Sequence, residues 1–92
     1  MCRNIRRLYN IDPPASGAEV HDAALQFVRK VSGYREPSQA NAAAFEHAVE
    51  EVARAVQELL VSLETTAPPR DREVDATRAR ERAAKRYGEA AA

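Results

Sequence analysis

The fold is decided by residues 42–63, AAAFEHAVEEVARAVQELLVSL. Large apolar residues recur along this stretch in alternating steps of four and three, which is the spacing of one face of an α-helix. They are Phe45, Val49, Val52, Val56, Leu59 and Leu63. Alanines widen this face to roughly half of the helix circumference, and polar residues fill the rest. A face this broad can receive two neighbours, so we predict that the stretch is the central helix of a small bundle.

A shorter helix is predicted before it, over about residues 16–32. Ser16 and Glu19 have the spacing of a capping box, in which the serine hydroxyl and the glutamate carboxylate each accept a backbone amide of the other residue. Gly33 stands where a left-handed C-cap belongs. The residues that line the core face of this helix are Val20, Ala24, Phe27, Val28 and Val31.

The connection to the long helix, predicted over about residues 38–64, is short. We expect Ser38 to cap the start of that helix, because serine is a favoured N-cap residue. A loop this short joins helices that lie side by side in opposite directions. The two helices are therefore predicted to be antiparallel neighbours.

A third helix is predicted over about residues 71–87, after Pro68 and Pro69. Acidic residues gather at its start and basic residues at its end, which is the charge order that the helix dipole favours. Its only apolar stripe consists of Ala76, Ala79, Ala83 and Tyr87. Alanine buries little area, so we expect this helix to bind its neighbours weakly and to offer its stripe to a protein partner or to a second copy of the chain.

Length and composition predict one all-α domain that covers residues 1–92. The chain has 92 residues, no tryptophan and few aromatic residues, and it is rich in alanine, arginine and glutamate, a composition that favours helices over a sheet. Residues 1–15 are expected to form an irregular N-terminal segment, and residues 88–92 a loose tail. No apolar run approaches the roughly 18 residues that span a bilayer, and no signal-peptide region opens the chain. We therefore expect a cytoplasmic protein without a membrane partner.

The charges balance, with 14 lysines and arginines against 14 aspartates and glutamates. This balance does not favour a cationic protein that coats nucleic acid. Nucleic-acid binding is kept as an alternative because arginines gather in the first third of the chain and in the third predicted helix, although no continuous basic patch or aromatic platform accompanies them. The basic residues concerned are Arg6, Arg7, Arg29, Arg35, Arg78, Arg82 and Lys85.

Cys2 is the candidate for covalent chemistry. Removal of Met1 would leave an N-terminal cysteine beside Arg3, and a neighbouring cation and α-amino group lower the pKa of a thiol. Such a thiol can act as a nucleophile, a metal ligand or a redox sensor. The alternative is an inert thiol buried under the terminus. The chain has no second cysteine, so it forms no internal disulfide.

No metal or other cofactor is predicted. His21 and His47 do not combine with Cys2 in any zinc-binding spacing, and the glutamates of the long helix project away from its apolar face. The sequence has no glycine-rich phosphate loop, nucleophile elbow or kinase motif. A catalytic role is therefore not favoured.

Four blocks of the sequence together resemble one protein family. They are MCRNI at residues 1–5, FVRKVSG at 27–33, PS, AN and AF between residues 37 and 45, and APPR at 67–70. The family consists of small uncharacterised bacterial proteins, a domain of unknown function, and the resemblance runs to about Tyr87. It implies a bacterial origin and a single domain, and it transfers no activity.

These blocks supply the candidate binding residues, which are Arg3, Asn4, Arg29, Lys30 and Arg70. We hypothesise that they converge around Cys2. The function predicted from the sequence is that of a small non-catalytic cytoplasmic interaction or adaptor protein, whose partner is another protein or a second copy bound through the third helix. The alternatives are thiol chemistry at Cys2 and nucleic-acid binding.

Overall fold

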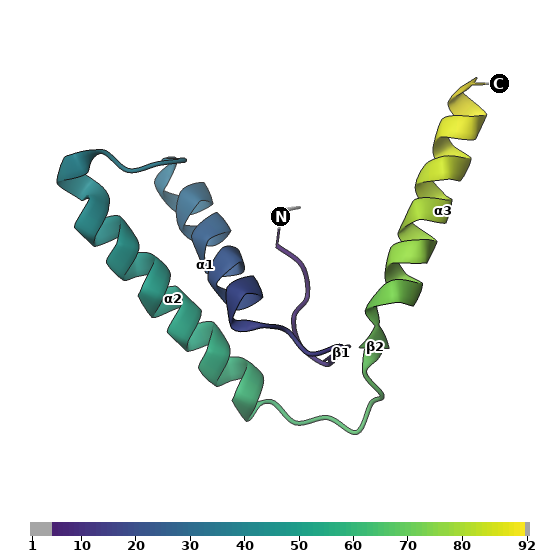
Figure 1. Ribbon diagram of the computed structural model, residues 1–92, viewed down its shortest axis with the longest axis horizontal. Helices are drawn as coiled ribbons and strands as arrows, with labels where there is room; N and C mark the ends of the chain where they lie inside the picture. Colours follow the sequence, from purple (N-terminus) through teal and green to yellow (C-terminus); the bar gives the residue numbers. More distant parts are fainter. Residues whose placement is uncertain (1–4, 92) are drawn as a thin grey trace.

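The computed structural model describes residues 5–91 and the side chains of residues 5–86. Figure 1 shows three helices joined by loops and one very short pair of strands. The elements are β1 (Ile11–Asp12), α1 (Gly17–Ser32), the 3-10 turn η1 (Gln39–Asn41), α2 (Ala42–Ser62), β2 (Arg70–Asp71) and α3 (Arg72–Ala91). The predicted all-α class is confirmed, and the two-residue parallel pair of β1 and β2 is an addition that no sequence pattern indicated.

Both ends of α1 are formed by the local signals in its sequence. The Ser16 hydroxyl accepts the backbone N–H of Glu19 at 3.2 Å, and the backbone N–H of Ser16 donates to the Glu19 carboxylate at 3.0 Å. The helix ends at Gly33, whose φ of 78° is left-handed and whose N–H donates to the Arg29 carbonyl at 2.9 Å. The predicted capping box and C-cap are confirmed.

Replacing Gly33 with alanine is expected to lower the free energy of unfolding by about 1 kcal/mol, because a residue with a Cβ atom is strained at positive φ. A Cβ atom at Gly33 would meet no other atom within 4 Å, so the cost is conformational and not steric. Gly17→Ala is the matched control, since that site is also open and lies inside the helix. Urea unfolding that gave equal losses for the two variants would contradict this account.

The start of α2 differs from the prediction. Ser38 precedes the 3-10 turn η1, and its side chain does not cap the long helix. Instead, the Ser38 hydroxyl accepts the side-chain amide of Asn41 at 3.0 Å, and the Ser38 carbonyl accepts the Asn41 backbone N–H at 3.0 Å. The serine therefore organises the turn that leads into α2, because the chain needs one tight turn before the helix can begin.

Helices α1 and α2 pack against each other as an antiparallel hairpin, as predicted (Figure 1). The buried core is thin. Among the described residues, the buried apolar side chains are those of Val20, Ala24, Val28 and Val49. Leu25, Phe45, Ala48, Val52 and Ala53 pack around the core while partly buried. Ala24 is only 1 % exposed, so its small side chain lets the two helices approach closely.

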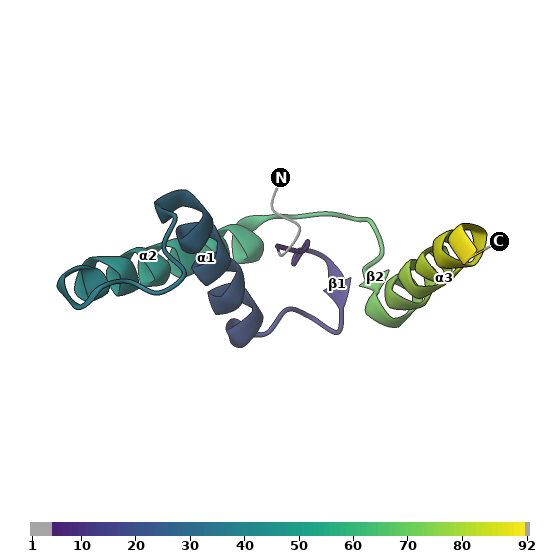
Figure 2. The same cartoon turned by 90° about the horizontal axis from the view of Figure 1, so that it is seen from above.

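Helix α3 stands away from this hairpin, as two views at right angles show (Figures 1 and 2). The radius of gyration of the chain is 16.9 Å, whereas a compact domain of this length has about 12 Å. The helix also runs on to Ala91, where the sequence predicted a loose tail from Gly88. One glycine costs a helix only about 1 kcal/mol, and the flanking alanines and glutamate are good helix formers.

Candidate functional site

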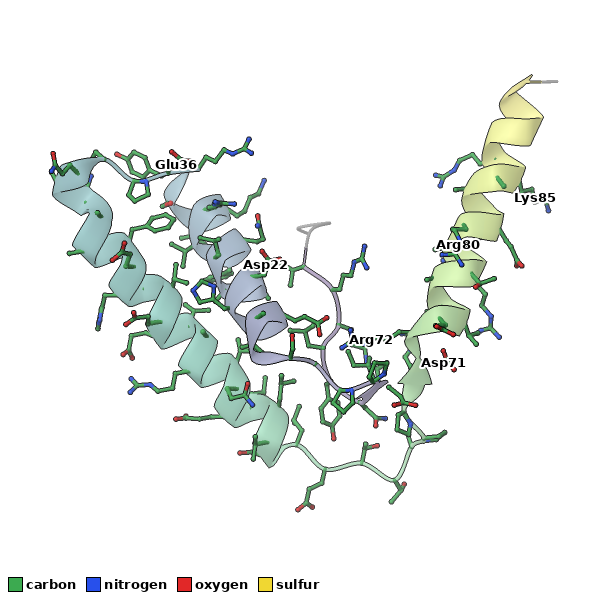
Figure 3. The ribbon with its side chains drawn as sticks, in the orientation of Figure 1. Asp22, Glu36, Asp71, Arg72, Arg80 and Lys85 are labelled. Atoms are coloured by element: carbon green, nitrogen blue, oxygen red, sulfur yellow. The ribbon has the colours of Figure 1, made fainter. Side chains whose placement is uncertain are left out.

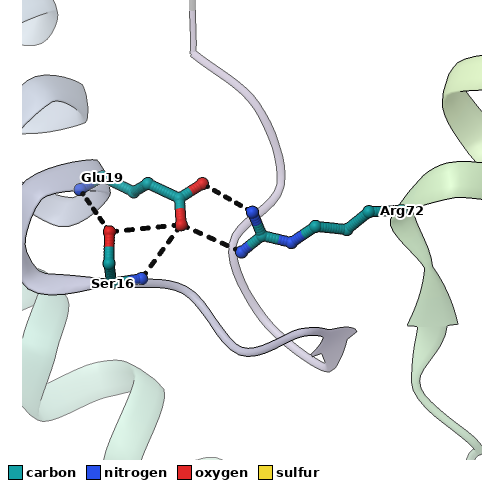
Figure 4. Close-up of polar contacts among 3 residues, drawn as sticks. All are labelled: Ser16, Glu19 and Arg72. Atoms are coloured by element: carbon teal, nitrogen blue, oxygen red, sulfur yellow. Dashed lines mark hydrogen bonds and ion pairs between the residues drawn. The ribbon is translucent and has the colours of Figure 1, made fainter.

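A bidentate ion pair connects the first turn of α3 to the first turn of α1 (Figure 4). The two terminal nitrogens of the Arg72 guanidinium donate to the two Glu19 carboxylate oxygens at 2.8 and 3.0 Å. Paired bonds of this kind fix orientation as well as distance. The Nε–H of Arg72 is buried and has no hydrogen-bond partner among the described residues. The cost of burying this unpaired donor offsets part of the stabilisation that the ion pair contributes. Glu19 therefore serves both the capping box and the attachment of α3.

The same contacts lower the pKa of Glu19. The hydrogen bonds from Arg72 and from the Ser16 backbone, in that order, hold the pKa at about 2, against an ordinary value of 4.5. A carboxyl whose folded pKa is depressed stabilises the fold above its unfolded pKa, and this contribution is lost as the pH falls through the folded value.

The wild type is therefore expected to exceed Glu19→Gln in unfolding free energy by a constant amount above about pH 5. This difference is expected to shrink between pH 4.5 and about 2. Urea titrations of both proteins across this range measure it. A difference that stayed constant down to pH 2 would show that the Glu19 charge does not stabilise the fold.

A short parallel pairing lies beside the ion pair. In the register of β1 and β2, Ile11 faces Arg70 and Asp12 faces Asp71, and the Arg70 backbone N–H donates to the Asn10 carbonyl at 2.9 Å. Asn10 has a φ of 54°, a left-handed conformation that asparagine tolerates better than most residues. Its side-chain amide donates to the Ala67 and Pro68 carbonyls at 3.2 Å each. Asn10 thus joins the N-terminal segment to the loop before β2, since Ala67 and Pro68 follow it by 57 and 58 residues in the sequence.

The first turn of α3 is held by side chains of the preceding strand β2. The Asp71 carboxylate accepts the backbone N–H groups of Glu73 at 2.8 Å and of Val74 at 3.0 Å, as an N-cap does. The Arg70 guanidinium pairs with Asp75 at 3.0 Å. Figure 3 shows Arg72 at the base of α3, beside the N-terminal segment, whereas Arg80 and Lys85 stand on the free part of the helix. The helix therefore leaves the body of the protein in a defined direction.

The hairpin carries an open groove between α1 and α2. It is lined by His21, Leu25, Phe45, Glu46, Val49 and Glu50. The floor is apolar, and the carboxylates of α2 are exposed at its edge. A groove with an apolar floor and acidic edges has the chemistry to receive a helix that carries small apolar side chains and cations.

The predicted site residues fall in different places. Arg29 and Lys30 lie in the last turn of α1, and the Arg29 guanidinium donates to the Arg35 carbonyl at 2.9 Å. This turn is about 15 Å along the helix axis from Glu19.

Arg70 lies beside the N-terminal segment, because its backbone N–H donates to the Asn10 carbonyl. Cys2, Arg3 and Asn4 lie outside the described residues, so their convergence with Arg29, Lys30 and Arg70 stays a prediction.

Sequence reasoning missed the two residues that attach α3, Arg72 and Asn10. One signal was present for Arg72, because a cation in the first turn of a helix opposes the helix dipole and needs an acidic partner. Nothing in the sequence identified Glu19, which lies 53 residues away, as that partner.

His21 and His47 are both exposed, and His21 lines the groove. Among the described residues, no three histidine, cysteine, aspartate or glutamate side chains lie together in a way that would hold a metal ion. None of the helices in the described part of the chain has both the length and the apolar character that crossing a bilayer requires.

The fold and the junction define a class of small all-α proteins built from a helical hairpin and a projecting helix. The chain belongs to the family described as an uncharacterized conserved protein (DUF2277), whose model matches residues 1–78. The match covers the hairpin, the junction and the first two turns of α3, and it confirms the resemblance found in the sequence. No curated protein and no solved structure matches the chain.

Proposed function

We propose that this is a small non-catalytic bacterial interaction protein of the cytoplasm, which binds another protein through α3. The observation that carries the proposal is the exposure of this helix. Among its described side chains, all except Arg72, Asp75 and Ala83 are exposed. Helices in proteins owe most of their stability to packing of an apolar face, so an uncovered helix gains stability when a partner covers it.

The hairpin offers further support. Several large apolar side chains lie exposed on it, including Phe27 at 49 %, Val31 at 71 % and Leu59 at 53 %. Single exposed apolar residues are ordinary in small proteins, but here they accompany a core with only four buried apolar residues in the described part of the chain. Burial of these faces against a partner would add apolar area that the chain alone does not bury.

Site-specific photocrosslinking in the host cell tests the proposal. A photoreactive phenylalanine analogue at Ala83, on the stripe of α3, is expected to give a discrete protein adduct. Ala79→Glu, which places a carboxylate in the same stripe, is expected to reduce the adduct by about tenfold or more, because a desolvated charge weakens an apolar contact. The matched control has the analogue at Gln57, an exposed position of α2. Equal adducts from both positions, or none from Ala83, would contradict the proposal.

The two alternatives from the sequence have their own tests. Thiol chemistry predicts that Cys2 is alkylated faster than the cysteine of a model peptide. Nucleic-acid binding predicts retention on DNA or RNA that weakens as salt is raised. The exposed α3 supports the interaction role over both, because neither alternative requires an uncovered apolar face.

A further inference from the structure

We propose that the partner of α3 is a second copy of this chain, and that α3 of each copy docks in the α1/α2 groove of the other. This inference rests on the proposed function, because it uses α3 as the binding element. It adds the identity of the partner and the surface that receives the helix. An exchange in which each copy gives and receives the same element closes as a twofold dimer.

The chain leaves more of its surface exposed than a compact protein of its size does. The structure exposes 7583 Å², whereas a compact monomer of this mass exposes about 5,300 Å², an excess of about 2,300 Å² per chain. Stable homodimers bury on the order of 1,000–2,500 Å² per partner. The excess exposed area of one chain therefore equals the area that each partner buries in an obligate dimer interface.

The charges of α2 and α3 are complementary. Helix α2 carries four glutamates against one arginine, a net charge of −3, and α3 carries six cations against three carboxylates over residues 72–86, a net charge of +3. Glu46 and Glu50, at the edge of the groove, are four residues apart. Arg82 and Arg86 on α3 have the same spacing, so they can face that pair one to one.

The direction of α3 keeps it out of the groove of its own hairpin. The Glu19–Arg72 ion pair, the β1/β2 pairing and the Asp71 cap hold the base of α3 so that the helix points away from its own hairpin (Figures 1 and 2). A chain attached in this way does not fill its own groove. Helices α2 and α3 have 21 and 20 residues, so each is about 30 Å long and one can lie along the other.

Charge also decides between the two ways in which copies could pair. If the grooves of two hairpins faced each other, Glu46 and Glu50 of one copy would oppose the same residues of the other, and like charges in an interface repel. Docking of α3 replaces this repulsion with attraction. The exchange of α3 is therefore favoured over the pairing of two hairpins.

A charge-swap experiment tests the inference. The full chain is prepared as wild type, as Glu46→Lys/Glu50→Lys and as Arg82→Glu/Arg86→Glu, and dimerisation is followed by light scattering and sedimentation over a range of concentrations. The wild type is expected to dimerise. Each variant alone is expected to dimerise about a hundredfold more weakly, because both docking contacts become repulsive. An equal mixture of the two variants is expected to regain the wild-type affinity to within about tenfold, since both contacts of the heterodimer are again attractive.

The control is Glu36→Lys/Glu64→Lys, which makes the same change in net charge at exposed positions outside α2 and outside the groove, and it is expected to dimerise as the wild type does. Three results would overturn the inference. They are a wild type that stays monomeric at every concentration, a mixture that stays monomeric, and a Glu46→Lys/Glu50→Lys variant that dimerises as tightly as the wild type. The first leaves the proposed function standing if the adduct from Ala83 contains a different protein, so the two failures are distinguishable.

Discussion

Val49→Asp is expected to abolish the cooperative folding of the helical hairpin. Val49 is 4 % exposed and is the only residue of α2 among the four buried apolar residues of the described chain. An unpaired carboxylate buried there costs several kcal/mol, and the thin core of a chain this short leaves a stability of only about 5–10 kcal/mol to oppose it. Far-UV circular dichroism and thermal unfolding measure the result.

The matched control is Val61→Asp, which makes the same substitution in the same helix at a side chain that is 76 % exposed. It is expected to change the free energy of unfolding by less than about 0.5 kcal/mol. Cooperative melting of Val49→Asp within about 1 kcal/mol of the wild type would show that the α1/α2 contact is not the core of this protein.

Arg72→Ala is expected to detach α3 from the hairpin while the hairpin itself stays folded. The substitution removes both bonds to Glu19. A parallel strand pair of two residues is too short to persist alone, so the β1/β2 pairing should open with it. Hydrogen exchange resolves the effect by segment. The amides of residues 67–78 should lose about tenfold or more of their protection, whereas those of α1 and α2 should lose little.

Arg78→Ala is the control, because Arg78 is an exposed arginine of the same helix. Glu19→Ala should mimic Arg72→Ala within the junction, and the double variant should lose no more protection there than either single variant, because partners in one interaction are not additive. If the amides of residues 67–78 exchanged equally fast in Arg72→Ala and Arg78→Ala, the ion pair would not be what holds α3 to the hairpin.

The hairpin could be predicted because its signals are local. The apolar spacing from Phe45 to Leu63, the capping box of Ser16 and Glu19, and the left-handed position at Gly33 each act within one or two helical turns. Ser38 was assigned to the wrong cap because a serine at the start of a 3-10 turn has the same appearance in sequence as one at the start of an α-helix.

The junction could not be predicted, because it joins residues that are far apart in the chain. Asn10 meets Ala67 and Pro68, and Glu19 meets Arg72, through a fold that has to form first. The alanine stripe of α3 did predict weak packing within the chain. The sequence did not predict the direction in which the junction turns α3 away from its own hairpin, because periodicity within one helix does not record how that helix is attached.

The central claim is that α3 projects from the hairpin and is covered only by a partner. Small-angle X-ray scattering tests it most directly, at a concentration where light scattering shows a single chain. The account predicts a radius of gyration close to 16.9 Å. A value near 12 Å, that of a compact domain of this length, would show that α3 folds back onto its own hairpin and would contradict the account.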